Sequence, residues 1–303
     1  MATNGRQTPL IRMVIRATVL ALFAAGVATI PAAAAQPEHG TPSWSRADYL
    51  ALGDSVAFGY RPPEVTPPAD YLNADNFVGY PEDFAKAAGL ELANASCSGE
   101  TTTSLIVPGG QSNGCENSVG SPVGYRTAFP LHVSYAGTQL NYAIQYLRSH
   151  PRTRLVTIDI GANDMFVCQE TTADHCTGAD YAAGLKQVAR NLATIYAALR
   201  YQAHYRYALV LVSYYSLDYR DAAQSAQSRQ LNAALAAPTE RFGGIVADSY
   251  GAFQRASAQA GGDTCAAGLL IALPAGGCNI HPSALGHRVL AAAVANALWR
   301  FRR

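Results

Sequence analysis

The sequence has almost no excess of charge of either sign. Its 303 residues include 22 Lys and Arg against 21 Asp and Glu, a formal net charge of +1 at neutral pH. A basic stripe or a polybasic segment, which is typical of proteins that bind nucleic acid or anionic membranes, is missing. Nucleic acid is therefore not an expected partner.

Compact clusters of metal-binding side chains are missing as well. The six cysteines include no Cys-x-x-Cys pair and no tight group with histidine, which are the usual zinc ligands. Internal repeats and an interdomain linker are also absent. We therefore predict no metal site, and a single domain over residues 36–303.

Long apolar runs are confined to the N-terminus. Arg6, Arg12 and Arg16 precede an apolar run from about residue 17 to 30, which a proline and four alanines follow. A membrane anchor is the alternative, but the run is shorter than the roughly 20 residues that span a bilayer. We predict that residues 1–35 are a cleaved signal peptide. The secreted protein, without these three arginines, would have no membrane anchor and a net charge of about −2.

An exported chain with an even number of cysteines is expected to form disulfides. Six cysteines allow many pairings, but here they fall into three couples of close neighbours along the chain. We predict structural disulfides within these couples, namely Cys97 with Cys115, Cys168 with Cys176, and Cys265 with Cys278.

Five short apolar runs alternate with segments of helical period. The runs predict strands near residues 49–52, 90–95, 155–160, 207–215 and 244–248. Apolar residues three or four apart predict helices near residues 81–88, 140–147, 185–199 and 283–299. This alternation is typical of parallel sheets with helices on both faces. We predict an α/β fold, a three-layer αβα sandwich around a central five-stranded parallel sheet.

Polar residues follow three of the predicted strands. Ser55 follows the first, residues 94–99 end the second, and Asn163 follows the third. In such sheets, function collects where the carboxyl ends of strands meet loops. Gly-Asp-Ser at a strand end suits a serine nucleophile, which needs a base and donors for the developing oxyanion. The Gly-x-Ser-x-Gly elbow of the α/β-hydrolases is not present.

Four motifs resemble, in the same order, the blocks of the SGNH (GDSL) hydrolases. They are Gly53-Asp54-Ser55 with Gly59, Asn94-Ala95-Ser96-Cys97-Ser98-Gly99, Gly161-Ala162-Asn163-Asp164, and His281-Pro282 with Gly286. The chain is thus identified as a member of this family, in its secreted lipase/esterase branch. The resemblance implies a flavodoxin-like fold and hydrolysis of a small-molecule or lipid ester through an acyl-serine intermediate, without cofactor. We expect a monomer.

The resemblance also assigns a role to each motif. Ser55 would be the nucleophile, and His281 the general base that later protonates the leaving group. The backbone N–H groups of Ser55 and Gly99 and the side-chain amide of Asn163 would form the oxyanion hole.

The last motif departs from the family pattern. Members usually have Asp three residues before the histidine, where this chain has Cys278 followed by Asn279. Some secreted members use a main-chain carbonyl instead. We therefore expect the carbonyl of Cys278 or Asn279 to accept the Nδ1 proton of His281, held in place by a bridge to Cys265. Asp263 is the alternative acceptor.

Two other functions fit the same motifs. A cell-envelope acyltransferase would use the same serine chemistry, with a sugar or lipid hydroxyl in place of water. A non-catalytic binding protein would keep only the scaffold, but the intact motifs argue against it. The Pro-rich segment 61–76 and the Gly/Ser/Asn-rich segment 108–130 are expected to be either walls of the site or ordinary surface loops.

Overall fold

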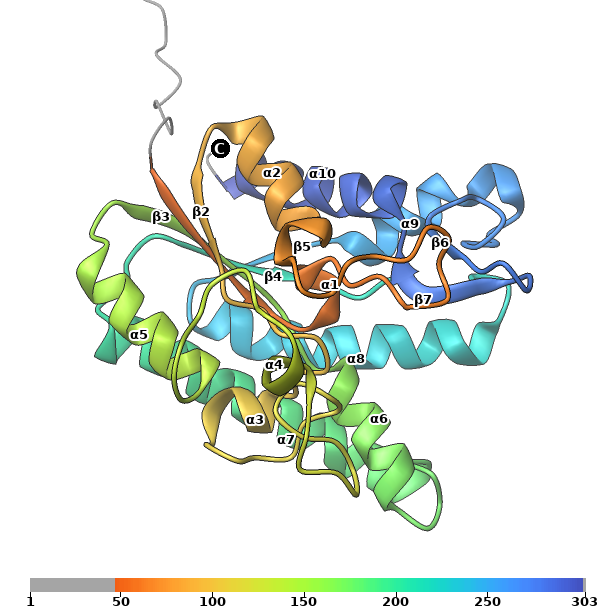
Figure 1. Cartoon of the computed structure of the whole chain (residues 1–303), viewed down its shortest axis with the longest axis horizontal. Helices are drawn as coiled ribbons and strands as arrows, with labels where there is room; N and C mark the ends of the chain where they lie inside the picture. The colour runs from red at the N-terminus through yellow and green to blue at the C-terminus, as the bar shows by residue number, and fades with distance from the viewer. Residues whose placement is uncertain (1–46, 302–303) are drawn as a thin grey trace, which may run out of the picture. The chain divides into compact units, whose positions relative to one another are not determined.

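A five-stranded parallel sheet forms the centre of the protein (Figure 1). The computed structural model describes residues 47–301, so the predicted signal peptide lies outside the described residues. The strands are β1 (Asp48–Gly53), β2 (Glu91–Asn94), β3 (Thr153–Asp159), β4 (Ala208–Val212) and β5 (Ile245–Ala247), in the order β2-β1-β3-β4-β5. Every neighbouring pair is parallel. The predicted fold class is confirmed.

The middle strands are apolar on both faces because helices cover both sides of the sheet. All six residues of β1 are buried, and in β3 only one residue is partly exposed. Leu50, Leu52, Leu155 and Ile158 are among the largest fully buried side chains. Burial on both faces explains why these strands are continuous apolar runs rather than alternating ones.

Helices form the two outer layers (Figure 1). One layer contains α2 (Tyr80–Ala88), α9 (Ser249–Ala256) and α10 (Ala284–Phe301). The other contains α3 (Thr102–Ile106), α5 (Gln139–Ser149), α7 (Gly178–Ala197) and α8 (Ala222–Arg241). The remaining helices are α1 (Ser55–Phe58), α4 (Tyr125–Ala128) and α6 (Ala162–Thr171), with short turns at Ala74–Asn76, Ala198–Gln202 and Ala258–Ala260. None of the helices in residues 47–301 is both long and apolar enough to span a bilayer.

Two further strands lie outside the main sheet, and the sequence did not predict them. β6 (Leu270–Ala272) and β7 (Cys278–Pro282) form an antiparallel pair. β7 carries His281, and α10 begins two residues after the strand ends. The pair therefore presents the histidine from outside the five-stranded sheet.

The three disulfides join the same cysteines as the sequence spacing predicted. Their Cα–Cα distances are 5.6 Å for Cys97–Cys115, 5.2 Å for Cys168–Cys176 and 5.7 Å for Cys265–Cys278. These distances lie within the usual range for disulfides. Two of the bridges flank the candidate site, because one encloses the segment with Gly99 and the other holds β7.

The two irregular segments pack against each other through aromatic rings. Phe58, Phe77 and Tyr125 are buried in a small second core, and Tyr71 and Phe129 pack against it. The ring centroids of Tyr71 and Phe129 are 5.1 Å apart. Segments 61–76 and 108–130 thus share a core of their own, beside α1, which begins with Ser55.

Candidate active site

The predicted site residues lie together at the carboxyl edge of the sheet. Ser55 follows β1, Gly99 follows β2 and Asn163 follows β3. The strand order places β2 on one side of β1 and β3 on the other. The chain therefore reverses direction across the sheet at β1, and ligands bind in the crevice at such switch points.

Ser55 and His281 are in hydrogen-bond contact although they are 226 residues apart in the sequence. The distance between Ser55 Oγ and His281 Nε2 is 2.8 Å. Ser55 is the first residue of α1, and its neighbour Asp54 caps that helix by accepting from the backbone N–H of Val56. The cap fixes the turn that carries the serine hydroxyl.

The ring of His281 is oriented by a side chain, not by the main chain. Nδ1 of His281 is 2.5 Å from Oδ1 of Asn279. An amide oxygen can only accept, so Nδ1 carries the proton and Nε2 is left to accept from Ser55. The prediction that a main-chain carbonyl of Cys278 or Asn279 would accept the Nδ1 proton is wrong, because the acceptor is the side-chain oxygen of Asn279.

Local geometry explains why the amide side chain is used. Oδ1 of Asn279 also accepts from the backbone N–H of His281 at 3.1 Å, a turn in which an Asx side chain bonds two residues ahead. This turn brings the amide oxygen to the ring. The alternative acceptor, Asp263, is bound elsewhere: its carboxylate is 2.8 Å from Arg220 and accepts from the N–H of Ala266.

The imidazole ring of His281 is in its uncharged form when no substrate is bound. Removal from water disfavours the charged ring and lowers the pKa of His281 to about 4. At neutral pH the ring is therefore uncharged and can accept the proton of Ser55. A neutral partner such as Asn279 does not oppose this shift, whereas a carboxylate would favour the imidazolium.

The turn at Gly99 presents a backbone N–H to the same crevice. Gly99 has a φ of +81°, and an added Cβ would collide with the main chain of Asn113 and Gly114. Only glycine is accommodated there without strain. Within residues 47–301 the N–H groups of Ser55 and Gly99 donate to no protein acceptor, so both are available to a ligand in the cavity that these residues line.

Asn163 adds a side-chain donor next to these two N–H groups. Its Oδ1 accepts from Nδ2 of Asn113 at 2.8 Å, and its Nδ2 donates to Oδ2 of Asp54 at 3.2 Å. These bonds fix the amide orientation and leave its second N–H free. Sequence reasoning missed Asn113, because it lies in the irregular segment 108–130 and no motif marks it.

A buried acid lies directly behind the Gly99 turn. Glu100 is 2% exposed, and one of its carboxylate oxygens accepts from Nε2 of Gln139 at 2.9 Å. Gln139 in turn accepts from the N–H of Gly53 at 2.6 Å. Burial raises the pKa of Glu100 to about 7. Glu100 and Gln139 thus connect the turn after β2 with the turn before Ser55.

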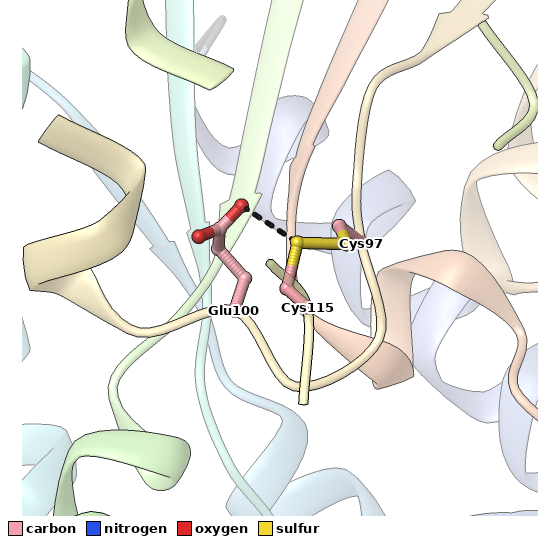
Figure 2. Close-up of side chains that lie close together, drawn as sticks. All are labelled: Cys97, Glu100 and Cys115. Carbon is pink, nitrogen blue, oxygen red and sulfur yellow. Dashed lines mark hydrogen bonds between the residues drawn. A yellow bond between two sulfur atoms is a disulfide. The ribbon is translucent and has the colours of Figure 1, made fainter. Parts of the chain in front are cut away.

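Figure 2 shows the Glu100 carboxylate directed at the disulfide between Cys97 and Cys115. One carboxylate oxygen is 3.5 Å from Sγ of Cys115, and the potential ligand atoms of the three residues lie within 4.8 Å of one another. Metal ions bind cysteine as the thiolate. Since both cysteines form a disulfide, they offer no thiolate in the oxidised protein, and the trio is not a set of metal ligands.

A cavity of about 680 Å³ opens at the serine, within the usual range for small-molecule sites. On the side of α6 and α8 it is lined by Met165, Phe166 and Leu231 together with polar side chains, namely those of Asn163, Gln169, Glu170, Gln224, Gln227 and Ser228. On the side of the histidine it is lined by Tyr60, Tyr215 and Ile280. The ring centroids of Tyr60 and His281 are 5.0 Å apart. Asn113 also lines the cavity, so the segment 108–130 contributes to its wall. Tyr60 directly precedes the segment 61–76, of which no residue lines the cavity.

Comparisons with known proteins agree with this geometry. Residues 51–289 match the GDSL-like lipase/acylhydrolase family, whereas no curated protein matches the sequence. Among solved structures, phospholipase A1 from Streptomyces albidoflavus NA297 is similar at 18% identity and a TM-score of 0.54, over 84% of this chain and 100% of its own. The lipase Lip_vut3 from a goat rumen metagenome is similar at 14% identity and a TM-score of 0.50, over 83% of this chain and 97% of its own. At such identities the two structures establish the fold alone.

Proposed function

The chain belongs to the GDSL-like lipase/acylhydrolase family and is a carboxylic ester hydrolase, and we propose that it is secreted and works through an acyl intermediate on Ser55. The observation that carries the proposal is the 2.8 Å contact between Ser55 Oγ and His281 Nε2, in a cavity that Gly99 and Asn163 also line. A nucleophile, its base and an oxyanion hole are the parts that acyl transfer requires.

In the first half of the reaction, Ser55 Oγ attacks the ester carbonyl carbon while Nε2 of His281 takes the hydroxyl proton. The carbonyl oxygen becomes the oxyanion, which the N–H groups of Ser55 and Gly99 and the amide of Asn163 stabilise. The C–O bond to the alcohol then breaks, and His281 gives its proton to the leaving oxygen. The products are the free alcohol and acyl-Ser55.

In the second half, water replaces the alcohol. His281 takes a proton from the water as its oxygen attacks the acyl carbon, and then returns that proton to Ser55 Oγ as the ester bond breaks. Asn279 keeps the Nδ1 proton in place through both halves, so that Nε2 alternates between base and acid. The carboxylic acid leaves and the serine hydroxyl is restored.

The positions of the proton donor and the oxyanion hole orient the substrate. Because His281 protonates the leaving oxygen, the alcohol part extends past Tyr60 and Ile280, which line its side of the cavity. The acyl part then extends towards Met165, Phe166 and Leu231. These three apolar side chains support an acyl group longer than acetyl, since burial of each CH₂ contributes about 0.8 kcal/mol.

Secretion is supported by the N-terminal sequence and by the disulfides. Residues 1–35 have the basic start, the apolar run and the small residues of a signal peptide. Three disulfides and no free cysteine among the described residues are typical of proteins that fold outside the cytosol.

A series of nitrophenyl esters with acyl chains of increasing length tests the proposed function. We expect turnover by the oxidised protein to depend on chain length, and no turnover above the uncatalysed rate by Ser55→Ala. Asp75→Asn, a change at an exposed residue, is the matched control and keeps wild-type activity. Equal rates for wild type and Ser55→Ala with every ester would overturn the proposal. Product analysis with an added sugar or glycerol acceptor separates hydrolysis from acyl transfer.

A further inference from the structure

Two carboxyl groups are buried side by side behind the oxyanion hole. Asp159 ends β3 and Asp54 follows β1, and the backbone N–H of Asp54 donates to the carbonyl of Asp159 at 3.0 Å. Each residue is 1% exposed, and their carboxyl groups lie within hydrogen-bonding reach of each other. Two carboxylates in contact and out of water do not both ionise, so the pair holds at least one proton.

The hydrogen bonds around the pair decide which residue holds the proton. Asp54 accepts three hydrogen bonds: from the N–H of Val56 at 2.9 Å, from the hydroxyl of Tyr214 at 2.6 Å and from Nδ2 of Asn163 at 3.2 Å. Oδ1 of Asp159 has no partner at all. Three donors favour the charge on Asp54, and an oxygen without a donor favours the acid form of Asp159.

No positively charged side chain next to Asp54 and Asp159 would compensate for a negative charge on both of them. Tyr214, Tyr215 and Tyr80 face the pair, and burial raises the pKa of each phenol, so all three stay neutral. His287, which is buried on α10, is also neutral, because burial lowers its pKa to about 3. No lysine or arginine within residues 47–301 forms an ion pair with either carboxyl group.

We propose that Asp159 is a positioning residue that carries a proton and donates it to Asp54, so that one negative charge, and only one, holds the Asn163 amide in the oxyanion hole. This inference rests on the proposed function. Asp54 fixes one N–H of Asn163 and thereby directs the other at the developing oxyanion. Burial and the adjacent charge of Asp54 hold the pKa of Asp159 well above its usual range.

Ionisation of Asp159 would harm the reaction in two ways. It would place a second negative charge behind a site where negative charge develops in the transition state, and such charges repel strongly out of water. It would also remove the donor that Asp159 offers to Asp54. Neither effect changes the cavity in which the ground-state ester binds. Ionisation of Asp159 should therefore lower kcat and leave KM unchanged.

Two substitutions distinguish three possible roles of the Asp159 side chain, namely as a proton donor, as a charged carboxylate and as a group that only fills space. Asp159→Asn keeps a neutral donor of the same shape, whereas Asp159→Leu keeps the bulk without a donor. With a nitrophenyl ester we expect Asp159→Asn to stay within about threefold of the wild-type kcat. Asp159→Leu should lower kcat by roughly tenfold or more at unchanged KM. An Asp159→Asn variant as impaired as Asp159→Leu, or a fully active Asp159→Leu, would overturn the proposal.

Difference infrared spectroscopy gives a readout that depends neither on catalysis nor on the folding of Asp159→Leu. At neutral pH the wild type should show the carbonyl stretch of a protonated carboxylic acid that Asp159→Asn lacks. Absence of that difference would contradict a protonated Asp159 even in a fully active enzyme. Conversely, if the protein shows this carbonyl band but hydrolyses no ester, Asp159 is protonated as proposed and the proposed function is wrong.

Discussion

At the scale of single residues, Asn279 has the place that a carboxylate usually occupies beside a catalytic histidine. Its amide oxygen accepts from Nδ1 of His281 at 2.5 Å and so fixes the tautomer, but it adds no charge to stabilise the imidazolium. In the proposed mechanism the Ser55–His281 pair therefore works with a neutral third partner. This arrangement has consequences for both the rate and its dependence on pH.

Asn279→Ala should lower kcat by about 10- to 100-fold, because the ring loses the acceptor that fixes its tautomer. The kcat and KM values of the variant with a short-chain nitrophenyl ester check this, with KM expected to change little. Asn73→Ala, at an exposed position away from His281, is the control. A variant of Asn279 with wild-type kcat would show that another group orients the ring.

The pH dependence of kcat/KM should follow the low pKa of His281. The ring accepts the serine proton only when it is uncharged, so activity falls as the pH drops through about 4 rather than through its ordinary value. Asn279→Asp should move this midpoint to higher pH, because a carboxylate beside the ring favours the imidazolium. Rate profiles with an ester that does not ionise test both statements, and a wild-type midpoint near 6.5 would contradict the first.

The motifs predicted which residues meet, and the reason is physical. Ser55, Gly99 and Asn163 follow parallel strands, whose carboxyl ends necessarily share one edge of the sheet. The partner of His281 was not predictable in the same way. The oxygen that meets Nδ1 of His281 belongs to the side chain of Asn279, and it is brought there by a local turn that the sequence does not specify.

At the scale of elements, the central strands were predictable and the strand pair that carries His281 was not. β1, β3 and β4 are apolar on both faces because they are buried. β6 and β7 are short, irregularly paired and partly exposed, so they leave no periodic signal. α8 was missed because it is rich in alanine and glutamine, with Leu231 and Leu235 as its only large buried aliphatic side chains.

The disulfide between Cys265 and Cys278 should matter more for catalysis than the disulfide between Cys168 and Cys176. Replacing both cysteines by serine frees β7 and should lower the free energy of unfolding by about 2–4 kcal/mol. It should also lower kcat, since β7 places His281 against Ser55. The matched control is the double serine variant of Cys168 and Cys176, which should lose stability but keep kcat. Equal effects of both pairs on kcat would contradict this role of β7.

At the scale of the whole molecule, a stable fold contains several buried acids near the site, and stability should therefore depend on pH. Glu100 has its pKa raised to about 7 by burial. A raised pKa means that the native state binds the proton more tightly than the unfolded chain, so stability is lost as the pH rises from about 4.5 to 7. Glu100→Gln stays neutral and should escape this loss.

Urea unfolding at pH 5 and pH 8 measures the difference. Relative to wild type, the free energy of unfolding of Glu100→Gln should rise by about 2–4 kcal/mol between the two pH values. Glu240→Gln, an exposed change in α8, should show no such rise. A difference between Glu100→Gln and wild type that is the same at both pH values would show that Glu100 ionises normally.

The central claim is that the fold turns Ser55 into a nucleophile by placing His281 beside it. Labelling with a serine-reactive phosphonate, followed by peptide mass mapping, tests this claim most directly. The account predicts one adduct on Ser55 of the oxidised wild-type protein, none on Ser55→Ala and much slower labelling of His281→Ala. A folded, oxidised wild-type protein that carries no adduct on Ser55 would contradict it.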